Sequence, residues 1–237
     1  MLVTGCWFNY RSKLPIAVTN NQEPETKMHL TFNRQNFHSL CHQLAKKDKH
    51  LKSIIREYGY PPVWTRAANF QTLIHIILEQ QVSLASARAA LNKLKERLGT
   101  ITPGKLLILS DQELKACYFS RQKIVYARSL AEAIISKRIN LKKMSALDDA
   151  EIRQQLKTIK GIGDWTVDVY LLFALQRTDV FPLGDLAMVN ALKEIKQLPV
   201  ETSQEKLLSL AETWRPYRSI ATMLFWHHYI QKRRIKS

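Results

Sequence analysis

This 237-residue sequence is poor in cysteine and in long apolar runs, and each shortage excludes a class of protein. Its three cysteines, Cys6, Cys41 and Cys117, are odd in number and far apart, which argues against a disulfide framework and against a four-cysteine zinc or iron–sulfur site. No uninterrupted apolar run approaches the roughly 20 residues that cross a bilayer. We therefore expect a reduced, soluble protein with no membrane-spanning segment.

Acidic residues are also scarce relative to basic ones. The chain has 36 Lys and Arg against 20 Asp and Glu, a net charge of +16 with neutral histidines. A hydrophobic share of 46% and a charged share of 24% are typical of a folded chain, here of one domain or two small ones. The positive excess indicates a polyanionic partner, nucleic acid first and an anionic membrane second.

The chain divides into an irregular beginning and a long helical remainder. Residues 1–28 have no sustained helical or strand period, and we expect an irregular arm there. After this arm, apolar residues recur at helical spacing, first at Phe37, Leu40, Cys41 and Leu44. Strand-like alternation is nearly absent, so the predicted fold class is all-α, with about ten helices on short connections.

Two of the seven glycines, Gly161 and Gly163, stand one residue apart between two helical stretches. Such a turn leaves free N–H groups at the start of the second helix, which bind a phosphate oxygen without reading base sequence. A tight helix–helix turn without a ligand is the alternative. The apolar residue between the glycines, the flanking lysines and the basic chain favour phosphate binding. The predicted phosphate-binding residues are Lys160, Gly161, Ile162, Gly163 and Thr166.

Residues 156–166 resemble the hairpin of the helix-hairpin-helix DNA glycosylases, and most of all the 3-methyladenine DNA glycosylase II branch, which removes alkylated bases. Residues 76–83, 179–186 and 214–219 resemble further motifs of that family, in the same order along the chain. The similarity extends over about residues 58–229. Four ordered motifs are far more specific than any one of them.

The resemblance implies that Asp185 is the catalytic residue. When a damaged base leaves, positive charge develops on the sugar, and a fixed carboxylate stabilises this charge and can orient or deprotonate the attacking water. Asp185 also precedes an apolar helical run, which is the position of an N-cap. One residue can perform both roles.

Aromatic residues are the candidates for the base pocket. Trp165 occupies the position where bifunctional relatives carry a nucleophilic lysine, so the resemblance implies a monofunctional enzyme that leaves an abasic site. The face of Trp165 would favour an electron-poor alkylated base, and packing in the core is the alternative. Tyr58 and Trp64 either line the pocket or staple the N-terminal helices.

A glycosylase must flip the nucleotide out of the duplex and fill the gap. The resemblance assigns this wedge to Gln80, Gln81 and Val82, with Gln81 as the first choice. Alternatively, Gln80 and Gln81 simply end a helix. Asp164 departs from the family pattern; it can still cap the second hairpin helix, but we expect it to weaken phosphate binding.

No essential cofactor is expected. Because no cysteine follows Cys117, the resemblance implies no iron–sulfur cluster. Some relatives hold a Na⁺ or K⁺ ion on main-chain carbonyls of the hairpin, which here would be those of Lys157, Ile159 and Ile162.

The prediction is a two-lobed all-α glycosylase with its DNA cleft between the lobes. Residues 29–78 and 178–237 would form one lobe with Asp185, and residues 79–177 a helical barrel with wedge and hairpin. It would act as a monomer on damaged bases of 3-methyladenine type in duplex DNA, in the cytoplasm with the nucleoid if the source is bacterial. The alternatives are a non-catalytic helix-hairpin-helix DNA-binding module, and a glycosylase for hypoxanthine, uracil or oxidised guanine.

Overall fold

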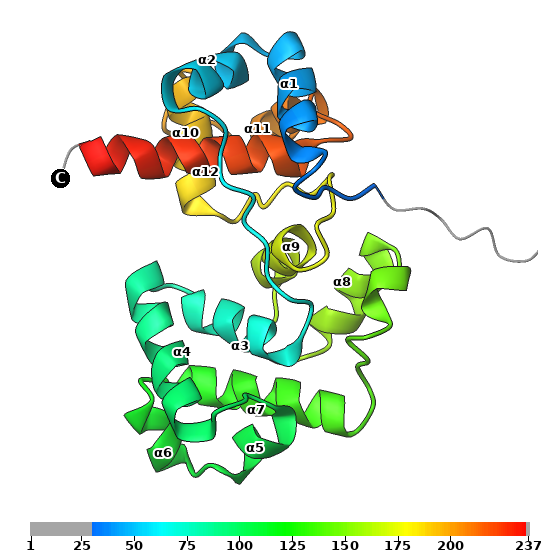
Figure 1. Cartoon of the computed structure of the whole chain (residues 1–237), viewed down its shortest axis with the longest axis vertical. Coiled ribbons are helices and arrows are strands. Elements are labelled where there is room, and N and C mark those ends of the chain that lie inside the picture. The colour runs from blue at the N-terminus through cyan, green and yellow to red at the C-terminus, as the bar shows by residue number, and fades with distance from the viewer. Residues whose placement is uncertain (1–29, 236–237) are drawn as a thin grey trace, which may run out of the picture.

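Helices build the chain from residue 30 to residue 235, the part that the computed structural model describes (Figure 1). The predicted arm at residues 1–28 lies outside the described residues. Extended pairing within residues 30–235 is limited to one antiparallel bridge, between Thr31 and Arg177. The predicted all-α class is confirmed. The helices are α1 (Phe37–Lys47), α2 (Lys49–Tyr58), α3 (Phe70–Glu79), α4 (Leu84–Leu98), α5 (Pro103–Ile108), α6 (Asp111–Ala116), α7 (Arg121–Ile135), the 3₁₀ turn η1 (Met144–Ala146), α8 (Asp149–Lys157), α9 (Asp164–Phe173), α10 (Leu186–Ile195), α11 (Gln204–Glu212) and α12 (Arg218–Ile235).

Polar caps decide where several helices begin. Ser110 opens α6 in a reciprocal capping box with Glu113, because each side chain accepts the other's main-chain N–H. Ser83 caps α4 by accepting the Ser86 N–H at 3.1 Å. Since α3 ends at Glu79, the chain turns from α3 into α4 through only residues 80–83, which we call the wedge loop.

Two hydrophobic cores define two lobes, which lie one above the other in Figure 1. The first lobe combines α1 and α2 with α10, α11 and α12, from the two ends of the described chain. The second lobe contains α3 to α8 and most of α9. Helix α9 joins the cores, because its Leu171 is buried in the second and its Leu172 in the first.

The place of α3 differs from the predicted division of the chain. The prediction assigned residues 29–78 to the lobe shared with the C-terminus. Phe70, Leu73 and Ile77 are instead buried in the core of the second lobe, where α3 packs against α4, α7 and α9. The change of lobe therefore falls in the linker before α3, because α3 is apolar on nearly all sides and is buried by three neighbours.

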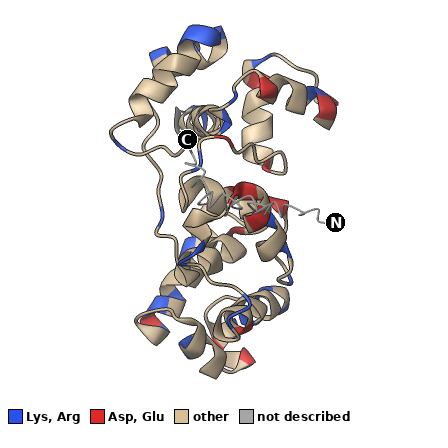
Figure 2. Ribbon diagram, turned by 90° about the vertical axis from the view of Figure 1, so that its right-hand side faces the viewer, with Lys and Arg blue, Asp and Glu red and all other residues tan. Residues whose placement is uncertain are grey.

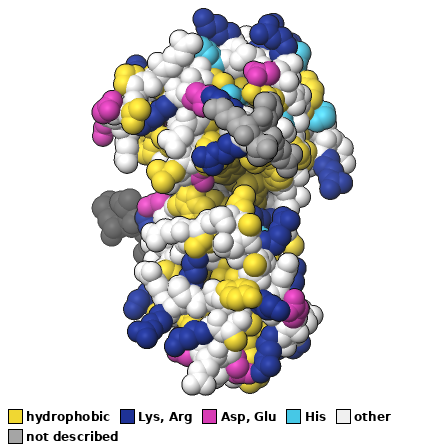
Figure 3. All heavy atoms as spheres, turned by 90° about the vertical axis from the view of Figure 1, so that its left-hand side faces the viewer, with side chains coloured by type: hydrophobic (Ala, Val, Ile, Leu, Met, Phe, Trp, Pro, Cys, Tyr) yellow, Lys and Arg dark blue, Asp and Glu magenta, His cyan; other side chains and the backbone are white. Residues whose placement is uncertain are grey.

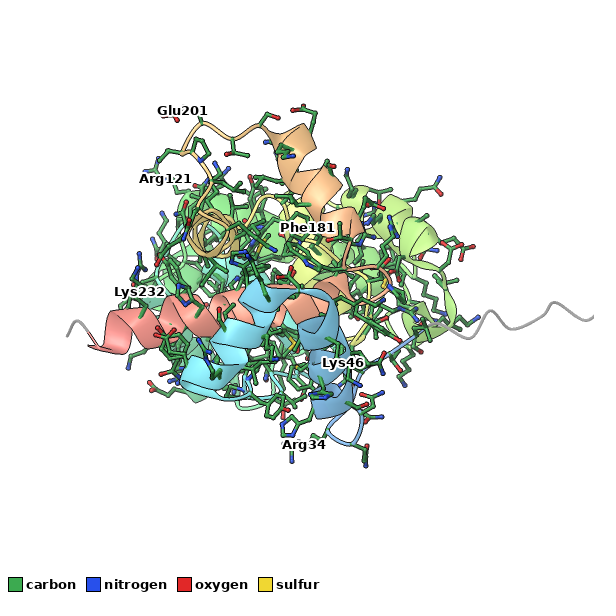
Figure 4. The ribbon with its side chains drawn as sticks, turned by 90° about the horizontal axis from the view of Figure 1, so that it is seen from above. Arg34, Lys46, Arg121, Phe181, Glu201 and Lys232 are labelled. Atoms are coloured by element: carbon green, nitrogen blue, oxygen red, sulfur yellow. The ribbon has the colours of Figure 1, made fainter. Side chains whose placement is uncertain are left out.

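Positions with Lys, Arg, Asp and Glu are spread along the ribbon of both lobes (Figure 2). Seen from above, Lys46 and Lys232 project outward, whereas Phe181 lies inside the molecule (Figure 4). Between residues 30 and 235, no helix is long and apolar enough to cross a membrane.

Candidate active site

Asp185 lies at the N-terminus of α10, in the segment that leads from α9 of one lobe into the helices of the other. Its Oδ1 accepts the main-chain N–H of Met188 at 2.9 Å, and its own N–H donates to the Pro182 carbonyl at 2.9 Å. The predicted N-cap role is confirmed. The carboxylate also stands at the positive end of the α10 dipole, which stabilises its charge.

Two tryptophans hold the same carboxylate. The Nε1–H of Trp165 in α9 donates to Asp185 Oδ2 at 3.0 Å, and the Nε1–H of Trp226 in α12 donates to Oδ1 at 3.0 Å. The donors to the side chain of half-buried Asp185 are thus neutral N–H groups from α9, α10 and α12. The carboxylate is oriented by three hydrogen bonds, and none of these donors carries a positive charge.

Trp226 was not predicted as a site residue. It stands 41 positions from Asp185 in a largely buried stretch of α12, where no local motif distinguishes it from a core residue. A buried indole N–H requires an acceptor, and this is the only signal in the sequence. That signal does not say which acceptor the folded chain supplies.

The hairpin, residues 158–163, connects α8 to α9. Gly161 has φ +88°, and a Cβ there would lie 2.0 Å from the Tyr126 ring, so both conformation and space demand glycine. Gly163 has an ordinary φ of −104°, and a Cβ there would have no atom within 4 Å. The backbone conformation of Gly163 is therefore open to other residues, unlike that of Gly161. Its lack of a side chain leaves the N–H groups at the start of α9 open to a ligand.

Asp164 does not cap α9, although the sequence allowed that role. It is the first residue of the helix, after the N-cap Gly163, and its carboxylate accepts from Lys157 Nζ at 2.8 and 2.9 Å. The charge of Lys157 is therefore paired, while the neighbouring Lys160 is exposed. Both lysines are exposed, but of the two only Lys157 forms an ion pair among the described residues, so the positive charge of Lys160 is the one left for a phosphate.

The side chain of Gln80 changes two predicted roles, its own role in the wedge and the phosphate-binding role of Thr166. Gln80 Nε2 donates to the Gly161 carbonyl and to Thr166 Oγ1, each at 2.9 Å. Thr166 is 2% exposed, so its hydroxyl is engaged inside the protein and not offered to a phosphate. Gln80 ties the wedge loop to the hairpin, which its predicted role in the wedge did not anticipate.

The exposed part of the wedge loop is Gln81, Val82 and the N-cap Ser83. Gln81 adopts φ +58°, and Val82 is 45% exposed although it is apolar. Lys123 Nζ donates to the Leu78 carbonyl at 2.6 Å, which anchors the end of α3 from α7. The predicted wedge residues thus project from a loop anchored on two sides. Figure 3 shows hydrophobic side chains gathered between the lobes, with Lys and Arg side chains around them.

Tyr58 and Trp64 pack against α12. The Tyr58 ring lies 6.3 Å from that of His227 and 5.7 Å from that of His228, and the Trp64 ring lies 6.5 Å from that of His227. Tyr58 also contributes its carbonyl to His227 Nε2 at 3.2 Å. This is the stapling of N-terminal segments onto the C-terminal helix that the sequence offered as the alternative to a pocket role.

The three hairpin carbonyls predicted to bind a monovalent cation each keep at least one lone pair free of a main-chain N–H from residues 30–235. The Ile159 carbonyl accepts the Ile162 N–H at 3.1 Å and keeps a second lone pair, and within residues 30–235 no main-chain N–H donates to the carbonyls of Lys157 or Ile162. The described residues contain no group of three or more His, Cys, Asp or Glu side chains that could hold a metal ion. Any ion here would be bound by the main chain.

Comparisons with known proteins agree with this architecture, a two-lobed helical fold with a helix-hairpin-helix beside a fixed carboxylate. The family model described as "HhH-GPD superfamily base excision DNA repair protein" matches residues 74–216. The chain belongs to this superfamily, as the sequence predicted.

Relatives and solved structures point in the same direction. DNA-3-methyladenine glycosylase 1 of Schizosaccharomyces pombe is 31% identical over 190 residues, which cover 77% of this chain and 83% of that protein. The structure of the S. pombe 3-methyladenine DNA glycosylase with abasic DNA has a TM-score of 0.73 at 29% identity, and covers 79% of this chain and 95% of that one. A DNA-3-methyladenine glycosidase from Bacillus halodurans has a TM-score of 0.69 at 26% identity, with 87% and 94% coverage.

Proposed function

We propose that this protein is a monofunctional DNA glycosylase of base excision repair, which hydrolyses the N-glycosidic bond of alkylated bases of 3-methyladenine type in duplex DNA. The observation that carries the proposal is the Asp185 carboxylate, which neutral donors from α9, α10 and α12 hold in place. The names of its relatives, DNA-3-methyladenine glycosylases, support the substrate class.

The site supplies what the reaction needs. As the base leaves, the sugar becomes oxocarbenium-like, and the fixed negative charge of Asp185 stabilises it without reorganisation. The same carboxylate orients the attacking water on the sugar. By the family resemblance, Trp165 stands at the position of the lysine that bifunctional relatives use for strand cleavage, so water would be the nucleophile and the product an abasic site.

DNA binding would be shared between hairpin and wedge loop. The open N–H groups at the start of α9 and the exposed Lys160 would hold phosphates, and the net charge of +16 would add salt-dependent affinity. Gln81 and Val82 would fill the gap that the flipped base leaves.

A Na⁺ or K⁺ ion on the carbonyls of Lys157, Ile159 and Ile162 would stiffen the hairpin where a phosphate binds. No redox cofactor is part of the proposal. The protein would act as a monomer in the compartment that contains the DNA, the cytoplasm if the source is bacterial.

A panel of duplexes tests the proposal. Methylated duplex DNA, and otherwise identical duplexes that carry one hypoxanthine, uracil or oxidised guanine, are incubated with the protein, and released bases are separated by chromatography. We expect release of 3-methyladenine above the other bases, and strand cleavage only after alkali. Preference for oxidised guanine would overturn the substrate class, and cleavage without alkali would overturn the monofunctional mechanism. Binding without any release would instead identify a DNA-binding module.

A further inference from the structure

We propose that the end of α3 is a positioning device for the Asp185 carboxylate. Glu79 and Gln80, consecutive in the chain, each begin a series of contacts that ends at Asp185, one at each carboxylate oxygen. This inference rests on the proposed catalytic role of Asp185. It assigns positioning roles to Arg66, Glu79, Phe173 and Gln80, which lie outside the reacting groups.

The first series runs through a stack of planar groups. Arg66 donates from both terminal nitrogens to Glu79, with Nη1–Oε2 at 2.8 Å and Nη2–Oε1 at 2.6 Å. The Arg66 guanidinium carbon lies 5.2 Å from the centre of the Phe173 ring. Phe173 in turn stacks on Trp226, with ring centres 5.3 Å apart at 21°. Trp226 Nε1 then donates to Asp185 Oδ1.

The second series runs through the hairpin helix. Gln80 Nε2 donates to the hydroxyl of buried Thr166 and to the Gly161 carbonyl. Thr166 follows Trp165 in the first turn of α9, and Trp165 Nε1 donates to Asp185 Oδ2. The side chain of Gln80 therefore fixes the turn of α9 from which the second indole reaches the carboxylate.

The chemistry of the Arg66–Glu79 pair favours a positioning role. The Glu79 side chain is 5% exposed and that of Arg66 24%, so both charges are largely removed from water. Such a buried ion pair stabilises a fold little more than apolar side chains of the same size would, which favours a role other than stability. Only arginine can grip a carboxylate with two parallel bonds and stack its flat face on a ring at the same time. The main-chain N–H of Arg66 also donates to the Phe173 carbonyl at 2.8 Å, which holds the stack in register.

The positioning device links insertion of the wedge loop into DNA to the position of the Asp185 carboxylate. Gln81 and Val82 directly follow Glu79 and Gln80, so a wedge loop seated in DNA shares its anchor with the carboxylate. A displacement of about 1 Å at a reacting group can cost on the order of a hundredfold in rate. The carboxylate would thus be in its working position only when the wedge loop is.

Indole N–H resonances test the device without any need for catalysis. In protein labelled with ¹⁵N-tryptophan, the Nε1–H signals of Trp165 and Trp226 are assigned with Trp→Phe variants. We expect Arg66→Lys to shift the Trp226 signal more than that of Trp165, and Gln80→Leu to shift the Trp165 signal more than that of Trp226, because each indole is nearer to one of the two series. The matched control is Arg128→Lys, because Arg128 is 25% exposed and pairs with Asp111 far from the carboxylate. It should shift neither signal.

A kinetic cycle provides the second readout. Arg66→Lys should lower the single-turnover rate of base release by about tenfold with little change in the Kd for abasic DNA. In the Asp185→Asn background the same substitution should have no further effect, because its action runs through the carboxylate. If Arg66→Lys does not fold, Phe173→Leu interrupts the same series.

The outcomes separate this inference from the proposed function. An unmoved Trp226 signal in folded Arg66→Lys or Phe173→Leu protein would overturn the positioning device, whatever the activity. The expected shifts in a protein that releases no base would support the contacts and overturn the glycosylase. Equal rate losses from Arg66→Lys with and without Asp185 would overturn the device even if the signals move.

Discussion

Two carboxylates in this protein are built alike and differ in one respect. Asp48 caps α2 and accepts from Trp214 Nε1 at 2.8 Å, as Asp185 caps α10 and accepts from Trp226 Nε1 at 3.0 Å. Asp48, however, also accepts from Lys196 Nζ at 2.6 Å. Asp48 is thus neutralised from within the protein, while Asp185 is held by uncharged donors.

The difference separates a structural carboxylate from a functional one. Burial pushes the pKa of Asp48 up, but the hydrogen bonds from Lys196 and Trp214 outweigh it and leave that pKa below its ordinary value. The negative charge of Asp48 is neutralised inside the fold by its ion pair with Lys196. Among the described residues, the donors to the half-buried Asp185 carboxylate are all uncharged N–H groups. Both carboxylates accept an indole N–H, so that contact does not distinguish a functional carboxylate from a structural one. The cationic donor at Asp48 and the uncharged donors at Asp185 do distinguish them.

Asp185→Asn should produce the largest effect. We expect the single-turnover rate of base release to fall by at least about a hundredfold, because the amide cannot stabilise the positive charge on the sugar. Asn is as good an N-cap as Asp, but its Nδ2 cannot accept the Trp165 N–H, so the free energy of unfolding should fall by about 1–2 kcal/mol. Quench-flow or gel assays on alkylated duplex DNA measure the first and urea titration the second. Unchanged release in a folded variant would remove the catalytic role.

Asp48→Asn should show the reverse pattern. The substitution leaves Lys196 largely buried without its anion, and we expect the free energy of unfolding to fall by about 3 kcal/mol. Base release at a temperature where both proteins are folded should be unchanged. Because the folded pKa of Asp48 is lowered, its stabilisation is full above pH about 4 and is lost as the pH falls through the folded value. A variant that loses activity at full stability would break the comparison.

The carboxylate of Asp168 extends the comparison, because we expect it to change the free energy of unfolding with pH in the direction opposite to Asp48. Burial raises the pKa of Asp168 to about 6, against the pull of Arg153, to which it is paired. A raised pKa in the folded state means that wild-type protein loses stability as the pH rises from about 4 to about 6. Relative to Asp168→Asn, this loss should total up to about 3 kcal/mol, as measured by urea titration across pH. A constant difference between the two proteins would contradict it.

Asp164→Asn should have the smallest effect. The change removes a negative charge from the start of α9 and frees Lys157, so binding to undamaged duplex DNA should tighten about two- to fivefold at low salt. Asp111→Asn is the matched control, since Asp111 is similarly exposed, also pairs with a cation, and changes the net charge equally. Equal tightening in both variants, by fluorescence anisotropy, would assign the effect to net charge alone.

The helices, their caps and the hairpin turn could be predicted from the sequence because each depends on residues that are close together in the chain. The apolar spacing of α1, the capping box of Ser110 and the turn at Gly161 act through neighbours within one helical turn, and the structure shows all three. Asp185 was found as a site candidate because its motif follows the hairpin in the family's order, and its N-cap role is likewise local.

What the sequence by itself determined is therefore the helices, their starts, the hairpin turn and the charge that suits DNA. Only the tertiary structure decided that Trp226 reaches Asp185, that Gln80 turns to the hairpin, and that Arg66 stacks on Phe173. The physical reason is that helix periodicity and capping depend on residues a few positions apart. The partner of a buried polar group depends instead on which distant helices pack together, and no local pattern encodes that choice.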